Sequence, residues 1–223
     1  MKHTLQQLAS VSVFMLAVTI ASAADKKPKA MTPKLVEAST ILVQDDFAAE
    51  KPDPKWISEG DGSGIIIEEG ALRIDGPAGG TRGLAETKFA EPVQDVHLQF
   101  LLKPLACQSI AFGFRQKTAF GYSVYGEIAR FGVVDRTLSP PGQPPYVSSF
   151  KPVTVATEQK DPKAWRRISI ECKGNKLLVR QDNKKVAELE HPFVGEEKTA
   201  FVLAGYGGVF MIDEVLITTP AKK

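Results

Sequence analysis

Two neighbouring stretches decide the fold: residues 97–103 (HLQFLLK) and residues 110–115 (IAFGFR). In both, bulky apolar side chains recur at every second position: Leu98, Phe100, Leu102, Phe112 and Phe114. Successive side chains of a β-strand point to opposite faces, so a period of two predicts two strands that each bury one face.

Short β-prone segments continue on both sides of this pair. They cover residues 65–67, 71–75, 121–125, 127–134, 167–172, 176–180, 186–189, 198–204 and 209–218. Turn sequences separate them, such as Glu68-Glu69-Gly70 and Asp182-Asn183-Lys184. No segment carries an apolar stripe of helical period and length. Many short strands joined by polar turns predict an all-β sandwich or barrel.

The first residues have the form of an export signal. Lys2 precedes an uncharged apolar run at residues 8–20, and Ala21-Ser22-Ala23 has the small-x-small form of a cleavage site. A membrane-spanning helix needs about 20 apolar residues, so this run is too short to be one. We therefore expect residues 1–23 to be a cleaved signal peptide and the protein to be exported, either periplasmic or secreted.

Two further segments follow from composition. Residues 24–40 are rich in Lys and Pro with little to bury, which predicts a disordered tether. Residues 41–220 are long enough for a single β-sandwich domain with its own core. The whole chain has 28 Lys and Arg against 26 Asp and Glu. Such an even balance provides no electrostatic footprint for a nucleic-acid partner.

The order of several landmarks makes a family resemblance visible. They are Asp45-Asp46-Phe47, Trp56, residues 70–74 (GALRI), residues 112–115 (FGFR), residues 165–168 (WRRI) and residues 212–215 (IDEV). This layout resembles the concanavalin A-like (laminin G-like) jelly roll. In particular it is similar to the exported bacterial domains grouped with the 3-keto-disaccharide hydrolase family. The resemblance implies two antiparallel sheets, one of them concave, adjacent first and last strands, and a carbohydrate partner.

The alternation of inward- and outward-facing residues along the strands predicts a binding surface. If the alternating apolar residues face the core, the intervening polar residues and the small residues Ala111 and Gly113 face the other way. Tyr122 and Tyr125 have opposite phases on the next strand, so only one shares this face unless a bulge intervenes. The predicted carbohydrate-binding residues on a concave sheet are Arg115, Gln99, Lys103, Tyr122, Tyr125 and His97. The alternative for His97, a single histidine at an outward-facing strand position, is an ordinary surface residue.

Three classes of function remain open at this stage. The first is a lectin-like carbohydrate-recognition domain. The second is a sugar-directed hydrolase, although neither the jelly-roll glucanase pattern Glu-x-Asp-x-x-Glu nor a Gly-x-Ser-x-Gly elbow occurs. No catalytic residue is assigned, and Asp75 and Glu127 are the candidates for a carboxyl group with a raised pKa. The third is a structural or adhesive protein of the cell envelope, which predicts an exposed apolar patch instead of a groove.

Metal and cysteine chemistry also remain open. Asp45, Asp46 and Asp213 lie on segments that the resemblance makes neighbours, which suggests a structural Ca²⁺ site; solvated turn residues are the alternative. No Cys and His cluster suggests zinc. Cys107 and Cys172 permit a disulfide in an exported protein, or they are two buried thiols.

Overall fold

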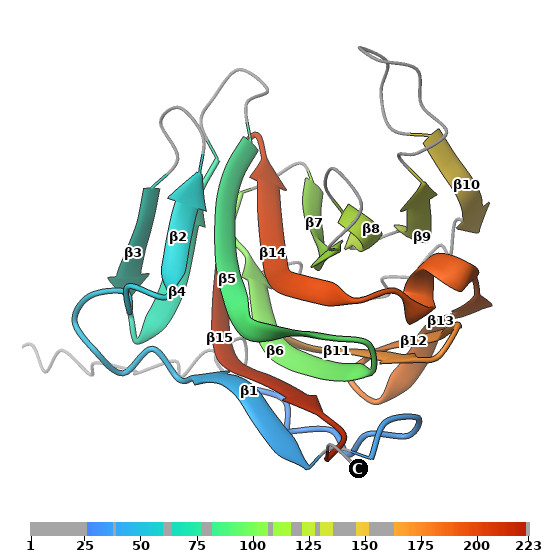
Figure 1. Ribbon diagram of the computed structural model, residues 1–223. Helices are drawn as coiled ribbons and strands as arrows, with labels where there is room; N and C mark the ends of the chain where they lie inside the picture. Colours follow the sequence, from blue (N-terminus) through green and yellow to red (C-terminus); the bar gives the residue numbers. More distant parts are fainter. Residues whose placement is uncertain are drawn as a thin grey trace, which may run out of the picture.

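The computed structural model describes residues 26–37, 39–59, 64–76, 82–106, 109–116, 122–127, 130–135, 146–151 and 163–221. The predicted signal peptide, residues 1–23, lies outside these residues. The described residues form two antiparallel sheets packed face to face (Figure 1). They confirm the predicted all-β sandwich.

The eight-stranded sheet contains, in spatial order, β13 (Lys184–Glu190), β12 (Lys176–Gln181), β11 (Arg166–Lys173), β6 (Val96–Pro104), β15 (Val209–Thr219), β4 (Ala71–Asp75) and β3 (Gly64–Glu68). Strand β1 (Thr40–Asp45) also pairs with β15, so the first and last strands are adjacent, as expected. The seven-stranded sheet contains β10 (Tyr146–Lys151), β9 (Arg130–Asp135), β8 (Tyr122–Glu127), β7 (Ser109–Gln116), β14 (Lys198–Tyr206), β5 (Arg82–Val93) and β2 (Trp56–Glu59).

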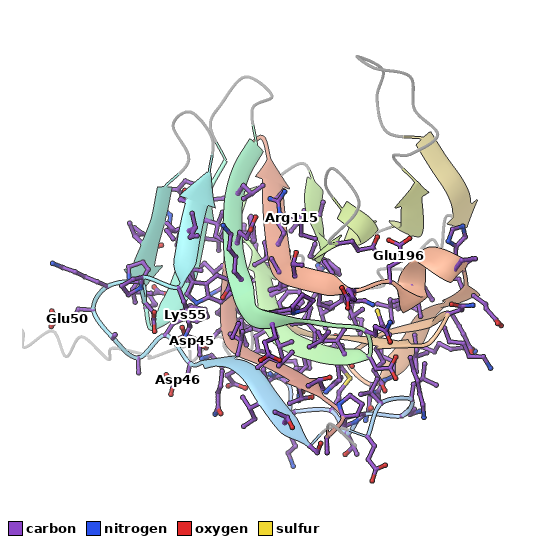
Figure 2. All side chains as sticks on the ribbon, in the orientation of Figure 1. Asp45, Asp46, Glu50, Lys55, Arg115 and Glu196 are labelled. Carbon is purple, nitrogen blue, oxygen red and sulfur yellow. The ribbon has the colours of Figure 1, made fainter. Side chains whose placement is uncertain are left out.

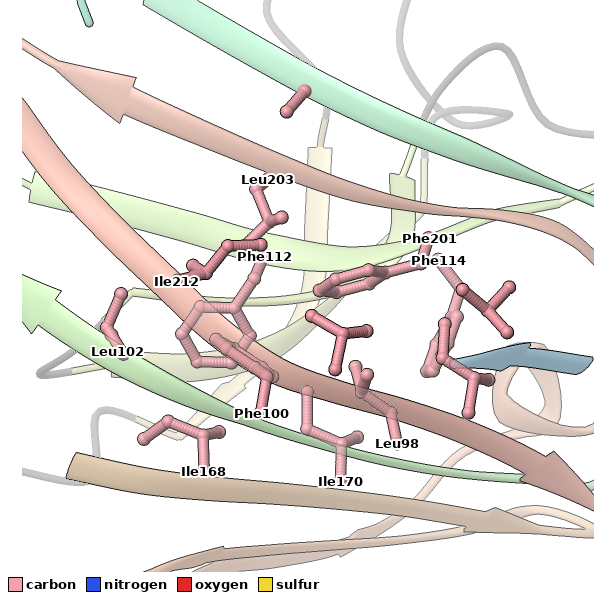
Figure 3. Close-up of a cluster of buried hydrophobic side chains, with 14 of the residues drawn as sticks. Leu98, Phe100, Leu102, Phe112, Phe114, Ile168, Ile170, Phe201, Leu203 and Ile212 are labelled. Atoms are coloured by element: carbon pink, nitrogen blue, oxygen red, sulfur yellow. The ribbon is translucent and has the colours of Figure 1, made fainter. Parts of the chain in front are cut away.

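An aromatic cluster fills the space between the sheets (Figure 3). The ring of Phe100 on β6 lies 5.5 Å from that of Phe112 on β7 and 5.6 Å from that of Phe201 on β14, between centroids. All five alternating apolar residues of the two deciding strands are at most 1% exposed. The predicted core phase of β6 and β7 is therefore confirmed.

Two predicted hairpin turns form as expected. Glu69 and Gly70 between β3 and β4 have φ angles of 53° and 70°, and Asp182 and Asn183 between β12 and β13 have 48° and 70°. Positive φ at both central residues matches the right-handed twist of the flanking strands, which is why such turns favour Gly, Asn and Asp.

The two sheets present very different outer faces. In Figure 1, β5 and β14 bend along their length away from the eight-stranded sheet, so the outer face of the seven-stranded sheet is concave. Residues 26–37, which we call the strap, lie on the outer face of the eight-stranded sheet and contact β6, β11, β12 and β15.

The strap is held by a buried carboxylate. Three successive backbone N–H groups, those of Lys34, Leu35 and Val36, donate to Oε2 of Glu171, the first over 2.7 Å and the third over 3.1 Å. The other oxygen, Oε1, accepts from Nη2 of Arg180 over 2.9 Å, and neither side chain of this ion pair is more than 2% exposed. Successive N–H groups that converge on one anion form a nest. This order contrasts with the disordered tether expected at residues 24–40.

Other polar side chains of the eight-stranded sheet also bind the backbone of the strap. Gln99 Oε1 accepts from the N–H of Met31 over 3.0 Å, and Arg180 Nη2 donates to the carbonyl of Thr32 over 2.7 Å. Arg167 Nη2 donates to the carbonyl of Pro28 over 3.0 Å. Buried polar groups need such partners, and the backbone of the strap provides them to the polar layer of Gln99, Arg180 and Arg167 beneath it.

His97 lies in this layer and is 1% exposed, so the expectation of a surface histidine is wrong. Its Nε2 lies 3.3 Å from Ser169 Oγ, and its Nδ1 lies 3.5 Å from Thr218 Oγ1. Burial lowers the pKa of His97 to about 4, and the positive charge of Arg180 acts in the same direction. The imidazole is therefore neutral at pH 7.

A buried lysine ties together the end of the sandwich near the 3-10 helix η2 (Pro192–Gly195). Lys198 Nζ donates to the carbonyls of Gln94, Val194 and Glu196 over 2.7, 2.6 and 2.9 Å. Burial lowers the pKa of Lys198, but the three carbonyls satisfy its ammonium hydrogens. Across the described ranges, no helix has the length and apolarity needed to cross a membrane.

Removing the anion beneath the strap is expected to destabilise the fold. In Glu171→Ala the buried guanidinium of Arg180 loses its counter-charge and the strap loses its acceptor, so the free energy of unfolding should fall by about 3–5 kcal/mol in urea denaturation. Glu188→Ala removes an exposed carboxylate of β13 that pairs with Lys185, and should leave the transition unchanged. Equal midpoints for the two variants would contradict the anchoring role of Glu171.

Acid is expected to weaken the fold through His97. Its pKa is near 6.5 in the unfolded chain and about 4 in the folded one, so between these values only the unfolded chain binds the proton. The free energy of unfolding should therefore fall as the pH drops from 6.5 towards 4, by about 3 kcal/mol for this group. Urea denaturation of His97→Gln across this range should show a shallower fall, and an unchanged slope would refute the assignment.

Candidate functional site

The predicted binding residues do not form one surface. His97, Gln99 and Lys103 lie on β6 of the eight-stranded sheet, whereas Arg115 lies on β7 of the seven-stranded sheet. Both groups point away from the core, but on opposite sides of the sandwich. The expectation that they share a concave sheet is therefore wrong for the three β6 residues, and Arg115 is left as the described candidate on the concave face.

Strand register brings two predicted tyrosine positions to Arg115. Tyr122 of β8 pairs with Arg115, and Tyr125 pairs with Gly113. The pairing shifts register between Phe114 and Arg115, which is the bulge that two positions of opposite phase require. Paired residues of antiparallel strands share a face, so both positions belong to the face of Arg115. The side chains of Tyr122 and Tyr125 lie outside the described part of the structure.

Arg115, which is labelled in Figure 2, is held in place by a carboxylate from another strand. Its Nε donates to Glu86 Oε2 over 3.1 Å, and its Nη2 pairs with the same oxygen. Glu86 lies on β5 and Arg115 on β7, so the ion pair spans β14, whose residues Ala200 and Val202 are opposite Arg115 and Glu86 in the sheet. Small residues on β14 leave room for a long side chain to cross.

Exposure distinguishes the two partners of this pair. The side chain of Glu86 is 1% exposed, whereas that of Arg115 is 34% exposed. Ala200 and Val202 are also buried, and with Leu84 they form a small apolar cluster on this face. The concave face therefore presents a guanidinium to solvent on a packed floor, with its negative partner buried beside it. Sequence reasoning missed Glu86, because its strand is distant in the sequence and carries no motif.

The described side chains do not form an acid–base pair on this face. Asp75 lies on β4 of the other sheet and binds Arg73 Nε over 2.7 Å, so it is not a candidate here. Glu127 of β8 pairs with Ala111, which places its position on the concave face. The backbones of β5, which carries Glu86, and β8, which carries Glu127, are three interstrand spacings apart, or about 14 Å. Paired glycosidase carboxylates lie about 5–10 Å apart. Glu86 is moreover neutralised by Arg115.

The β6 residues have structural partners on the opposite side. Gln99 binds the strap and is 5% exposed. Lys103 Nζ lies 5.6 Å from the ring centroid of Trp165, and Lys27 of the strap lies 5.5 Å from the same ring. Two cations near one indole attach the beginning of the strap to this sheet.

The predicted calcium ligands do not converge. Asp45 accepts from Trp56 Nε1 over 2.9 Å and pairs with Lys55 over 3.0 Å, while Asp213 pairs with Lys27 of the strap. Asp46 Oδ1 accepts from the N–H of Ala48 over 3.2 Å. Within the described ranges, no group of three His, Cys, Asp or Glu residues is arranged to hold a metal ion. The proposed trio is therefore not a metal site in this arrangement.

Cys172 carries a free, fully buried thiol, and burial raises its pKa to about 11. It behaves as a small apolar residue of the main core, as the second of the two alternatives expects for Cys172. Cys107 lies outside the described residues.

Comparisons with known proteins establish the fold class. No protein-family model and no curated protein matches the sequence, so the resemblance to the 3-keto-disaccharide hydrolase family stays a prediction. The chain is similar to a non-specific endo-β-1,3(4)-glucanase of family GH16 (11% identity, 87% of this chain and 100% of that one, TM-score 0.60). It is also similar to the β-glucanase of Bacillus licheniformis (8% identity, 82% of this chain and 99% of that one, TM-score 0.59). A third similar structure is carbohydrate-binding module CBM66 from Bacillus subtilis (11% identity, 74% of this chain and 96% of that one, TM-score 0.54). The protein thus has the concanavalin A-like jelly-roll fold.

Proposed function

We propose that this protein is an exported carbohydrate-recognition domain that binds glycans on the concave face of its seven-stranded sheet, around Arg115. The observation that carries the proposal is the Arg115–Glu86 ion pair, in which a buried carboxylate fixes a partly exposed guanidinium. Guanidinium groups present several N–H donors in a fixed plane, which suits the hydroxyl oxygens of a sugar.

The surroundings of Arg115 support the same partner. Tyrosine occupies the register positions opposite Arg115 and Gly113, and aromatic rings provide the flat apolar surface on which sugar rings stack. Structures with the same fold include a carbohydrate-binding module and enzymes that act on glucans. The signal-like residues 1–23 support export.

A sugar-directed hydrolase is the second candidate. Its candidate carboxyl groups are Glu86, which is buried, and Glu127, whose position lies on the same face. Hydrolysis would require a second carboxyl group to approach the scissile bond from β8. Binding without turnover separates the recognition domain from this alternative.

Substitution of Arg115 is expected to abolish most of the glycan binding. On a glycan array, Arg115→Ala should lower the affinity for any bound glycan by about tenfold or more, because hydrogen bonds from a charged donor are lost. Arg73→Ala is the matched control, since Arg73 is a partly exposed, ion-paired arginine on the other sheet.

A second variant distinguishes binding from folding. Arg115→Ala leaves Glu86 buried without its cation, whereas the double variant Glu86→Gln/Arg115→Ala removes both charges. Both should lose binding, and the double variant should regain thermal stability relative to Arg115→Ala. Glycan binding that survives in both variants would place the site elsewhere. An array without any bound glycan would favour a structural or adhesive envelope protein.

A further inference from the structure

A second cation lies on the concave face beside Arg115. Ala200 of β14 is opposite Lys88 of β5 on one side and opposite Arg115 of β7 on the other, so the three residues share one face of the sheet. Lys88 is exposed, whereas Ala200 is 1% exposed. Two positively charged side chains therefore flank a small buried residue, in a row that runs across the strands.

The ion pair with Glu86 brings the two cations closer together. Glu86 and Lys88 lie two residues apart on the same face of β5, which is about 7 Å along the strand. The side chain of Arg115 crosses β14 to reach Glu86. Its guanidinium therefore extends towards the strand that carries Lys88.

The three charges do not cancel. Glu86 is paired with Arg115, and Lys88 makes no ion pair with another described residue. Two cations and one carboxylate thus leave an excess of positive charge. The side chain of Glu86 is 1% exposed and that of Arg115 is 34% exposed, so solvent at this place meets the cations rather than the carboxylate.

Further charged positions of the concave face lie beside positions of the opposite sign. Glu127 of β8 is opposite Arg130 of β9. Glu59 of β2 and Arg82 of β5 are diagonal neighbours in the pairing of their two strands. The excess of positive charge on this face is therefore localised at Lys88.

An anion suits this surface better than a neutral group. A carboxylate or sulfate between the ammonium of Lys88 and the guanidinium of Arg115 accepts hydrogen bonds from both and compensates the excess charge. The small side chain of Ala200 leaves space for it between the two long side chains. Tyr122 occupies the next position of the row, opposite Arg115, and provides an aromatic residue for a sugar ring. The row therefore fits a sugar ring that carries its own acidic group.

We propose that the glycan bound on the concave face is acidic, with a carboxylate or sulfate group held above Ala200 between Lys88 and Arg115. The inference rests on the proposed glycan binding around Arg115 and adds the class of sugar. A uronic acid and a sulfated sugar present the same kind of anionic oxygens, and matched glycans distinguish them.

Pairs of glycans that differ only in charge test the proposal. On an array, each uronate-containing glycan is compared with its carboxyl-reduced form, and each sulfated glycan with its desulfated form. The acidic member should bind about threefold to fivefold more tightly, because one exposed ion pair is gained. The preference should shrink as the salt concentration rises, because salt screens exposed charges. A preference confined to one kind of pair supports the proposal and identifies the anion.

Substitution of Lys88 tests the position of the anion. In Lys88→Gln, isothermal titration with the most tightly bound pair should show that the affinity for the acidic glycan falls about threefold to fivefold, towards that for its neutral form. Lys176→Gln is the matched control, because it removes an exposed lysine of β12 on the other sheet and changes the net charge equally. It should leave both affinities unchanged. Both variants replace an exposed lysine by a polar residue, so their thermal unfolding should match that of the unsubstituted protein.

Three outcomes would overturn the proposal, and they differ in their consequence for the proposed function. Equal binding within every pair, together with loss of binding in Arg115→Ala, would show a recognition domain for neutral glycans. A preference for acidic glycans that survives in Lys88→Gln would place the anion elsewhere on the protein. Absence of binding to every glycan would contradict both the acidic ligand and the proposed function.

Discussion

The contact of Phe100 with Phe112 and Phe201 is the constraint on which the rest of the structure depends. It joins the two sheets through their inner faces and so determines which phase of each strand is buried. Every alternate residue then faces outward, on one side of the sandwich or the other. On β7 the outward phase presents Arg115 on the concave face, and on β6 it presents His97 and Gln99 beneath the strap. The concave face around Arg115 and the polar layer beneath the strap are therefore consequences of one packing arrangement.

The sequence predicts the core phase well, because alternation is a local property. Leu98, Phe100 and Leu102 are buried as their spacing indicates. Membership of a sheet is not local: alternation shows that a side chain points away from the core, but not towards which side of the sandwich. For this reason alternation alone predicts Gln99 beside Arg115, although the two residues occupy opposite outer faces. The partner of Arg115, Glu86, comes from a strand 29 residues away in the sequence, with a further strand between them in the sheet.

The strap illustrates a second limit. A Lys- and Pro-rich segment is typical of disorder, and composition describes only side chains. What holds residues 34–36 is their backbone, which donates three N–H groups to Glu171. Glu171 itself stands at an outward position of its strand, where a carboxylate is ordinarily solvated. The register shift opposite Arg115 is likewise a backbone feature, and it brings Tyr122 and Tyr125 to one face without any signal in their spacing.

The pairing of the first and last strands has a consequence for how the domain can be displayed. Thr40 is opposite Thr219, and the strap lies on the outer face of the same sheet, so both ends of the described chain belong to the eight-stranded side of the sandwich. Figure 1 marks the C-terminal end on this side. A surface, tag or neighbouring domain joined through either end is therefore held at the back of the sandwich. The concave face with Arg115 then points away from the attached surface or domain. An open face of this kind is accessible to a polymer that is too large to enter a closed pocket.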